Sequence, residues 1–268
     1  MSKTVGETEK YYGANRGVSV GSRLTSGTSA EVVEPILTLK DSAPPKQPIQ
    51  YYVKYSFTIT YILLLTTATI TFIEALRTNI PSVRHVLNLE TCVSIVAGYF
   101  YSLFIAKIDL YQLDNSLFDW NEITKMRYVD WSITTPMMLL ALCLVLSMNT
   151  NTTIHFTTFL PIILLNYFML YLGYLGEISV LTKLTAMIIG FIPFLLMFYI
   201  IFVMFVRPKY NYSNYVLYGI YLTVWSMYGI VYMFNEEYKN IAMNALDCTA
   251  KCLIGLGLWI YYTKIIQL

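Results

Sequence analysis

A lysine stands in the middle of the last long apolar stretch of the chain, where a charge is costly. Lys251 lies about 12 residues from either end of the stretch 240–263, roughly 17 Å along a helix axis. Its side chain is too short to reach a membrane surface from there, so the amine needs a buried partner, loss of its charge or covalent modification. Asp247 lies four residues earlier, on the same helix face. Taken alone, the pair fits a structural ion pair as well as a functional site.

The third apolar stretch carries a polar stripe that changes this balance. Arg127, Asp130 and Thr134 are spaced i, i+3 and i+7 and share one helix face. Two cations, on Arg127 and Lys251, then meet two anions, on Asp130 and Asp247, and the four charges sum to zero. A neutral buried quartet is tolerated, whereas removing one member leaves an uncompensated charge.

The sixth apolar stretch contributes aromatic rings at helical spacing. Trp225, Tyr228 and Tyr232 share a face beside the small Gly229. Such a stripe more often reflects interior packing or an interface belt than a ligand site. If it faces a buried lysine and two carboxylates, it becomes the wall of a slot for a flat, conjugated ligand.

The composition predicts the elements that must position these residues. Of the 268 residues, 56% are hydrophobic and 13% are charged, about half the charged fraction, near 25%, of a soluble domain. Disorder is excluded by the apolar content, and a net charge of +2 gives no reason to expect nucleic acid as a partner. The apolar residues form long blocks, which indicates an integral, multi-pass membrane protein in contact with a lipid bilayer.

Seven blocks are long enough to cross a bilayer, which takes about 20 residues each. The sequence therefore predicts an all-α, seven-transmembrane-helix bundle with antiparallel neighbours. The predicted helices span residues 55–76, 87–108, 123–147, 154–175, 180–206, 213–234 and 240–263. This membrane domain, residues 51–268, follows a polar segment, residues 1–50, for which we expect a flexible tail or a short ordered cap.

The charges of the short loops predict the orientation of the bundle. Basic residues gather at one end, and acidic residues outnumber basic ones at the other, which places the N-terminus outside and the C-terminus in the cytoplasm. The basic end carries Arg77, Arg84, Arg207, Lys209 and Lys264, and the acidic end carries Asp109, Asp114, Asp119, Glu122, Glu236 and Glu237 beside Lys125 and Lys239. Against this assignment, Lys40, Lys46 and Lys54 would lie outside.

The four cysteines all fall within apolar blocks, where cysteine usually acts as a small apolar residue. Their spacing offers no zinc-binding pattern. We therefore expect neither a disulfide nor a metal.

Together these motifs resemble the microbial (type 1) rhodopsins, in particular bacteriorhodopsin-like members and those of the viral and eukaryote-associated group. The resemblance rests on three motifs: Arg127-Tyr128-x-Asp130-Trp131-x-x-Thr134-Thr135-Pro136, Trp225-Ser-x-Tyr228 and Asp247-x-x-x-Lys251. It covers about 210 residues, although the first two helices contribute little beyond hydrophobicity.

The resemblance implies a light-absorbing cofactor, all-trans retinal, joined to Lys251 as a Schiff base. It assigns Asp130 as counterion and proton acceptor, Asp247 as second counterion, Arg127 as outward gate and Thr134 as a hydroxyl bonded to Asp130. The residues implied around the retinal are Trp131, Thr135, Asn166, Met169, Gly173, Gly190, Pro193, Phe194, Trp225, Tyr228 and Tyr232.

Three positions depart from the family pattern. Ala141 stands where the pumps usually have a carboxylate that returns a proton to the Schiff base, and Gly229 replaces the usual proline of the sixth helix. Glu90, near the start of the second helix, is either a solvated helix-end charge or part of a path for protons or cations.

Three functions remain open, none of them enzymatic. A light-driven outward proton pump would use Asp130 as acceptor and lack a carboxylate donor, with Glu236 and Glu237 where a proton-release group would sit. A light-gated cation channel would use Glu90 and Asn244 along a hydrated path, and a photosensor would signal to a separate partner. The partners implied are protons or small cations, and a homo-oligomer is left open.

Overall fold

The structure is a computed structural model that describes residues 48–113 and 119–265. The predicted polar segment, residues 1–50, therefore lies outside the described residues except for residues 48–50, which begin the first helix. Asp114 of the predicted acidic end lies outside them as well.

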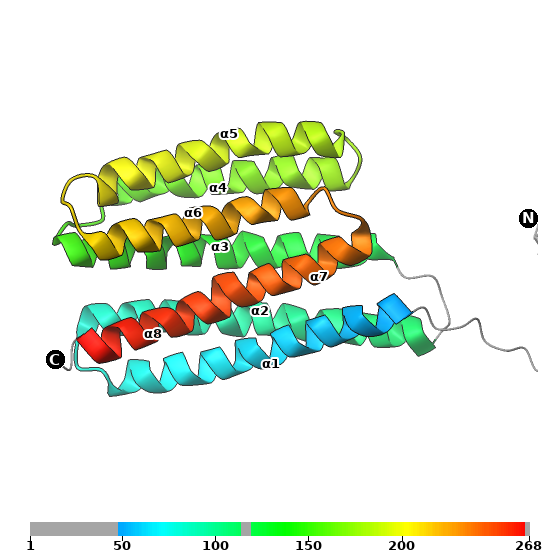
Figure 1. The fold of residues 1–268 in the computed structure, drawn as a ribbon, viewed down its shortest axis with the longest axis horizontal. Helices are drawn as coiled ribbons and strands as arrows, with labels where there is room; N and C mark the ends of the chain where they lie inside the picture. Colours follow the sequence, from blue (N-terminus) through cyan, green and yellow to red (C-terminus); the bar gives the residue numbers. More distant parts are fainter. Residues whose placement is uncertain (1–47, 114–118, 266–268) are drawn as a thin grey trace, which may run out of the picture. The chain divides into compact units, whose positions relative to one another are not determined.

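The described chain forms seven helical rods (Figure 1). Two rods contain a π-helical segment. In one it continues the α-helix, and in the other it lies between two α-helices. The elements are α1 (Pro48–Arg77), α2 (Pro81–Leu113), α3 (Trp120–Thr150), α4 (Phe156–Glu177), α5 (Lys183–Ile201) with η1 (Phe202–Val206), α6 (Tyr212–Val231), and α7 (Glu236–Asp247) with η2 (Cys248–Leu253) and α8 (Ile254–Ile265). The predicted seven-helix fold is confirmed, and most helices extend beyond their predicted ends.

Local signals in the sequence set several helix ends. Pro81 opens α2, a position that suits proline because its missing N–H would lack a helical partner anyway. The side chains of Asp119, Thr182 and Asn211 cap α3, α5 and α6 by accepting a backbone N–H of the first turn. At the other end of α3, Asn151 adopts the left-handed conformation, φ 56°, that commonly ends a helix.

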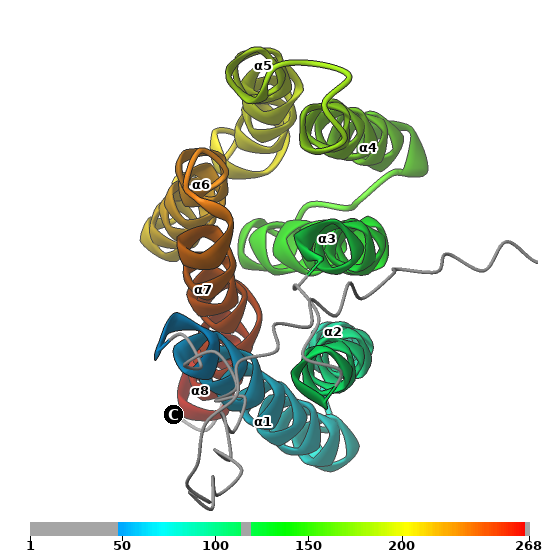
Figure 2. The ribbon, with the colours of Figure 1, turned by 90° about the vertical axis from the view of Figure 1, so that its right-hand side faces the viewer.

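The rods form a closed bundle when viewed along their axes (Figure 2). α2, α3 and α4 make one side, and α1, α7, α6 and α5 make the other. α3 therefore faces the rod of α7, η2 and α8 across the interior, which brings together the two stripes of charged residues predicted from the sequence.

Six of the described rods are long and apolar enough to cross a membrane. The remaining one, α6, carries five tyrosines in 20 residues, which lower its hydropathy. Large apolar side chains face outward along the helices, as expected for lipid contact: examples are Leu164, Ile188, Ile192 and Leu195, each more than half exposed.

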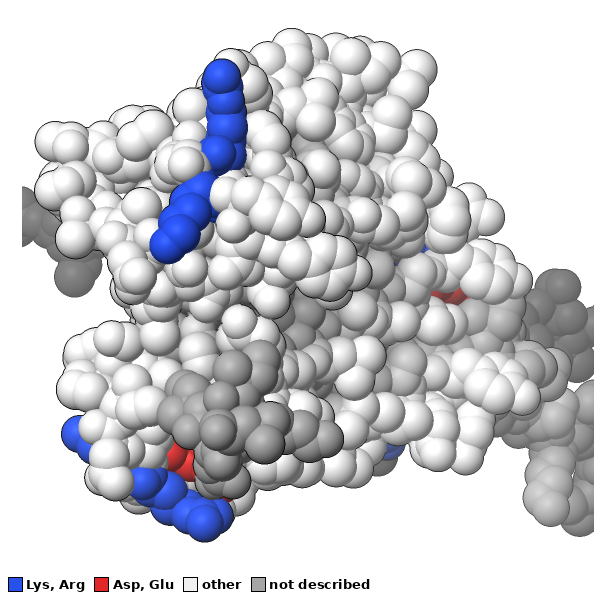
Figure 3. All heavy atoms as spheres, turned by 60° about the vertical axis from the view of Figure 1, so that its left-hand side comes forward, with Lys and Arg blue, Asp and Glu red and all other residues white. Residues whose placement is uncertain are grey.

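Basic side chains gather at the end of the bundle that holds the α1–α2 and η1–α6 connections. Figure 3 brings this end forward and shows them in two groups. Arg77 and Arg84 flank the first connection, and Arg207 and Lys209 lie in the second, all four exposed. We call this the basic end, and the opposite end, where α3 and α7 begin and α4 finishes, the acidic end.

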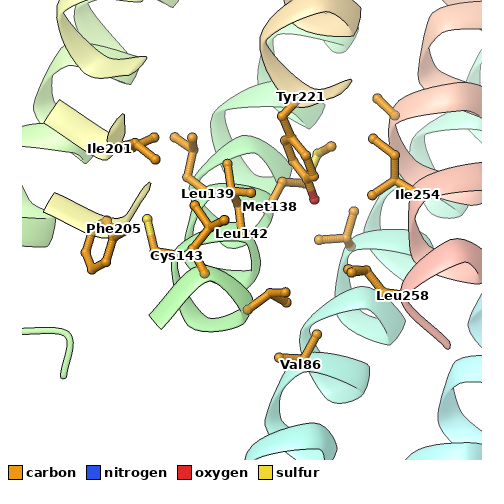
Figure 4. Close-up of a cluster of buried hydrophobic side chains, with 14 of the residues drawn as sticks. Val86, Met138, Leu139, Leu142, Cys143, Ile201, Phe205, Tyr221, Ile254 and Leu258 are labelled. Carbon is orange, nitrogen blue, oxygen red and sulfur yellow. The ribbon is translucent and has the colours of Figure 1, made fainter. Parts of the chain in front are cut away.

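The half of the bundle toward the basic end contains a large cluster of buried apolar side chains (Figure 4). Leu139, Leu142 and Cys143 of α3 are fully buried. They pack with residues of α2, η1, α6 and α8, among them Val86, Phe205, Tyr221 and Leu258. Polar groups of the site are thus separated from the basic end by a largely apolar layer.

Candidate functional site

Lys251 and Asp130 form a buried ion pair at the centre of the bundle. Lys251 Nζ donates to Asp130 Oδ2 at 2.7 Å, and the two side chains are 1% and 0% exposed. Lys251 belongs to η2 and Asp130 to α3. Among the described residues, Asp130 Oδ1 has no hydrogen-bond partner. The second oxygen of this carboxylate is therefore available to take a proton.

Asp247 is the more firmly held of the two carboxylates. Its Oδ2 accepts from the hydroxyl of Tyr101 at 2.7 Å and from Arg127 Nη1 at 3.2 Å. Its Oδ1 accepts from the hydroxyl of Tyr228 at 2.7 Å and from Trp131 Nε1 at 3.4 Å. With four donors around it, a negative charge on Asp247 is well compensated.

Arg127 is fixed by polar and aromatic partners together. Besides Asp247, its guanidinium donates to Tyr101, Asn240 and Asn244, at 3.3, 3.2 and 2.8 Å. Four rings surround it at 5.3–6.0 Å, a range typical of cation–π contacts. Those rings belong to Phe57, Tyr101, Phe104 and Trp131.

The two threonines of the α3 motif bond within their own helix. Thr134 does bond to Asp130, but its hydroxyl donates to the backbone carbonyl at 2.9 Å and not to the carboxylate. Thr135 bonds in the same way to the carbonyl of Trp131 at 2.6 Å. Asn166 of α4 then donates to the Thr135 hydroxyl at 2.8 Å, which ties α4 to α3.

A cavity of about 130 Å³ extends from Lys251 between α3, α4, α5 and α6. Its lining is almost entirely apolar, and Lys251 and Asp247 mark its polar end. Most of the residues that the resemblance places around the retinal line it: Trp131, Thr135, Met169, Gly173, Gly190, Phe194, Trp225, Tyr228, Tyr232 and Lys251. Pro193 and Asn166 are not among the lining residues, and Asn166 instead donates to Thr135, which is.

Glycines let side chains approach the cavity wall closely. A Cβ on Gly173 would lie 2.8 Å from the hydroxyl of Tyr128, and one on Gly229 would lie 2.5 Å from the ring of Phe191. Both contacts are shorter than real Cβ atoms show. At the position where the family usually has proline, the space is thus taken by Phe191.

The sequence left two surroundings open for Glu90, and the structure contradicts one of them, a solvated helix end. Glu90 is 1% exposed, inside the bundle toward the basic end. A Cβ on Gly255, four residues after Lys251, would lie 2.9 Å from Glu90 Oε2 and 3.4 Å from Thr67 Cγ2. Among the described residues, Glu90 Oε1 and the hydroxyls of Thr67 and Ser94 are buried without a hydrogen-bond partner.

At the acidic end, Glu236 belongs to a cluster of ion pairs rather than standing beside Glu237 as a pair of acids. Its carboxylate contacts the amines of Lys239 and Lys183 at 2.8 Å each. Lys239, which the sequence suggested to be a loop charge, is 1% exposed. Glu237 is only partly buried.

Sequence reasoning missed several residues that complete the site. Asn240 could have been found, because 240, 244, 247 and 251 follow a helical stripe on one side of the last rod. Tyr101 of α2 had no such signal, because a tyrosine within an apolar stretch usually indicates packing. Glu177 and Lys183 lie beside a short connection and looked like ordinary helix-end charges.

Comparisons with known proteins agree with this fold. The family model described as bacteriorhodopsin-like protein matches residues 52–265. The viral rhodopsin OLPVRII is 44% identical, with a TM-score of 0.73, over 80% of this chain and 98% of its own. A search of curated protein sequences finds no match.

More distant solved structures share the fold. The blue light-absorbing proteorhodopsin from Med12 is 22% identical with a TM-score of 0.63, over 81% of this chain and 99% of its own. Xanthorhodopsin, described as a light-driven ion pump with dual chromophore, is 20% identical with a TM-score of 0.65, over 79% and 92%. The chain belongs to the bacteriorhodopsin-like family of microbial rhodopsins.

Membership in this family implies retinal bound through a Schiff base to a lysine, in a multi-pass membrane protein. The cavity fits such a group. It is apolar and walled by aromatic rings, and its polar end is a buried amine beside two carboxylates. Lys251 is the lysine among its lining residues.

Proposed function

We propose that this protein is a light-driven outward proton transporter with retinal on Lys251. The observation that carries the proposal is the 2.7 Å contact between Lys251 Nζ and Asp130 Oδ2, beside a carboxylate oxygen with no other partner in the described chain. Bound retinal supplies light absorption and an isomerisation that reorients the N–H bond of the linking nitrogen. The residues around it then decide where the proton goes.

The difference between the two carboxylates favours Asp130 as the acceptor. Asp247 receives four hydrogen bonds, so protonating it would weaken several contacts at once. Asp130 receives one hydrogen bond at its carboxylate, from Lys251 itself. A proton that leaves Lys251 Nζ therefore finds its best site on Asp130, while Asp247 keeps its charge and its pairing with Arg127.

The route outward from Asp130 is lined by polar side chains. Arg127 joins Asp247 to Asn244 and Asn240, which lie about one and two turns closer to the acidic end along α7. Amides and a guanidinium can order water without taking the proton for good. If the N-terminus lies outside, as the loop charges predict, this route leads to the outer surface.

Return of a proton from the basic end has fewer polar groups to use. Ala141 occupies the position of the usual donor and is fully buried, between Leu139 and Cys143 in the sequence of α3. Glu90 is the buried carboxyl on that side, against Gly255 and therefore close to the turn that follows Lys251. We infer that Glu90 relays the proton that returns to Lys251. We also infer that this reprotonation is slower than it would be with a carboxylate on α3.

A light-gated cation channel is the second candidate. The unpartnered oxygens of Glu90, Thr67 and Ser94 gather in the half of the bundle where a pump must stay closed. Buried polar atoms of this kind are usually satisfied by water. A string of such waters continuing to Asn244 would make an ion path through the bundle.

Photocurrent measured against voltage in retinal-supplied cells separates the two functions. A transporter gives outward current over a wide voltage range, because the direction is set by the order of proton transfers. A channel gives a current that reverses sign at the equilibrium potential of the permeant ion. The Lys251→Ala variant is the control for both and should give no photocurrent. A reversing current would overturn the proposal of transport.

A further inference from the structure

Four charged side chains form a closed ion-pair cluster at the acidic end of the bundle. Glu177 ends α4, Lys183 begins α5, and Glu236 and Lys239 lie in the first turns of α7. Lys239 Nζ contacts both oxygens of Glu177, at 3.0 and 2.9 Å, and Glu236 Oε2 at 2.8 Å. Lys183 Nζ lies 2.8 Å from Glu236 Oε1 and 3.7 Å from Glu177 Oε2. We call these four residues the outer cluster.

Lys239 is the centre of the outer cluster and its most enclosed cation. The side chains of Lys239 and Glu177 are 2% and 5% exposed, whereas those of Lys183 and Glu236 are about a third exposed. Lys239 therefore stands between the two carboxylates with nearly all of its donors engaged. Positive and negative charges alternate, and the cluster as a whole is neutral.

The cluster is connected to the site at the centre of the bundle. Asn240, next to Lys239, donates to the backbone carbonyl of Glu236 at 2.8 Å and accepts from Arg127 at 3.2 Å. Two tyrosines from facing helices, Tyr128 and Tyr232, lie within electrostatic reach of Glu177. The outer cluster thus lies on the route that a proton leaving Asp130 would follow.

A cation between two carboxylates decides whether they can hold a proton. Two carboxylates alone in a buried place repel each other, and one of them keeps a proton. With Lys239 between them, both Glu177 and Glu236 are stabilised as anions. A pair of anions has no proton to give away when light changes the charges nearby.

The charges of Arg127, Asp130, Asp247 and Lys251 also favour late release of a proton to the outside. Before transfer, Lys251 and Arg127 are positive and Asp130 and Asp247 negative. Moving one proton from Lys251 Nζ to Asp130 leaves two neutral groups and one ion pair, so the net charge stays zero. A positive charge appears only when Lys251 regains a proton from the other side, and that charge then favours loss of the proton on Asp130.

We propose that Lys239 sets the time at which the transported proton reaches the outside. It acts as a positioning residue that holds Glu177 and Glu236 as anions, so that the outer cluster stores no releasable proton. The protein then takes up a proton from one side before it releases one on the other. This inference rests on the proposed transport function and names Glu177, Lys183 and Lys239 as parts of its outward path.

Replacing Lys239 should reverse this order. In Lys239→Met, Lys183 is the cation of the outer cluster that remains, 2.8 Å from Glu236 and 3.7 Å from Glu177. Glu177, the more buried carboxylate, then has no cation of the cluster within hydrogen-bond distance, and it shares a proton with Glu236 in the dark. Proton transfer from Lys251 to Asp130 changes the charges that face Arg127, and Asn240 connects Arg127 to the outer cluster. This change expels the shared proton early.

A flash experiment on the purified, retinal-bound protein in detergent tests the inference. A pH-sensitive dye in the medium reports whether proton uptake or proton release comes first. The wild type should turn the medium alkaline first, and Lys239→Met should turn it acid first. Lys239→Arg keeps the cation and should behave as the wild type, as should Lys125→Met, which removes an exposed lysine from the same end.

The wild-type trace is decisive even if Lys239→Met fails to bind retinal. An initial acid signal in the wild type overturns the inference and leaves proton transport standing. An alkaline-first signal that persists in a retinal-bound Lys239→Met also overturns the role of Lys239. Absence of any dye signal, together with a reversing photocurrent, instead contradicts the proposed transport function itself.

Discussion

Asp130 and Asp247 have the same side chain, yet their surroundings give them different tasks. Four donors from three other helices converge on Asp247, whereas the carboxylate of Asp130 has Lys251 as its donor in the described chain. A carboxylate with many donors keeps its charge, and one with few can change it. We therefore expect Asp247 to maintain the structure and Asp130 to take part in proton transfer.

Matched substitutions should separate these tasks. Asp247→Asn leaves the buried guanidinium of Arg127 without its anion, so we expect a loss of about 3–5 kcal/mol in stability. Asp130→Asn leaves Lys251 with Asp247 Oδ1 at 3.9 Å, so the protein should fold and bind retinal but lose proton transfer. Thermal loss of the visible band measures the first effect and flash-induced proton signals the second. Equal stability of the two variants would contradict this division.

At the scale of elements, α6 shows how a helix without its usual proline still shapes the cavity. Gly229 lies against the ring of Phe191 from α5, and both line the cavity. The ring occupies the space that a larger residue on α6 would need. Packing between α5 and α6 thus shapes this part of the cavity wall.

Gly229→Ala should disturb the cavity through this contact. A methyl group 2.5 Å from two ring atoms of Phe191 must push the ring aside. We expect a loss of about 1–3 kcal/mol, as for other overpacked interiors, and a shift of the absorption maximum.

Gly219→Ala on the same helix is the matched control, because a Cβ there has no atom within 4 Å. It should leave the spectrum unchanged and raise stability slightly. The double variant Gly229→Ala with Phe191→Leu should recover part of the wild-type behaviour. An unchanged spectrum and stability in the single Gly229→Ala variant would show that the ring moves freely.

At the scale of the whole membrane domain, charge distinguishes the two ends of the bundle. Arg77, Arg84, Arg207 and Lys209 are exposed at the basic end (Figure 3). Cytoplasmic loops of membrane proteins are rich in such residues. The proposed direction of transport depends on this orientation.

Cysteine labelling from one side of the membrane tests the orientation. Lys125 and Lys209 are both exposed and lie at opposite ends of the bundle. A membrane-impermeant thiol reagent added outside intact cells should label Lys125→Cys and spare Lys209→Cys, with permeabilised cells labelling both. The reverse pattern would mean that the proton moves inward.

The sequence predicted the bundle and the centre of its site because both depend on local patterns. Seven apolar blocks predict seven helices, and a buried lysine with carboxylates at helical spacing predicts where they meet. Tyr101 and Glu177 could not be found in this way, since their roles depend on contacts between helices far apart in the chain. Glu90 was recognised as unusual, but its burial follows from the way α2 packs against α8.

The aromatic enclosure of Arg127 has a consequence for how this protein can diverge. Its cation is held by side chains from α1, α2, α3 and α7, so a change in any one of them alters the fit of the others. We therefore expect these side chains to change together. We expect single substitutions at the glycines and methionines of the cavity to change absorption and kinetics. Around Arg127, by contrast, only coordinated replacements should be tolerated.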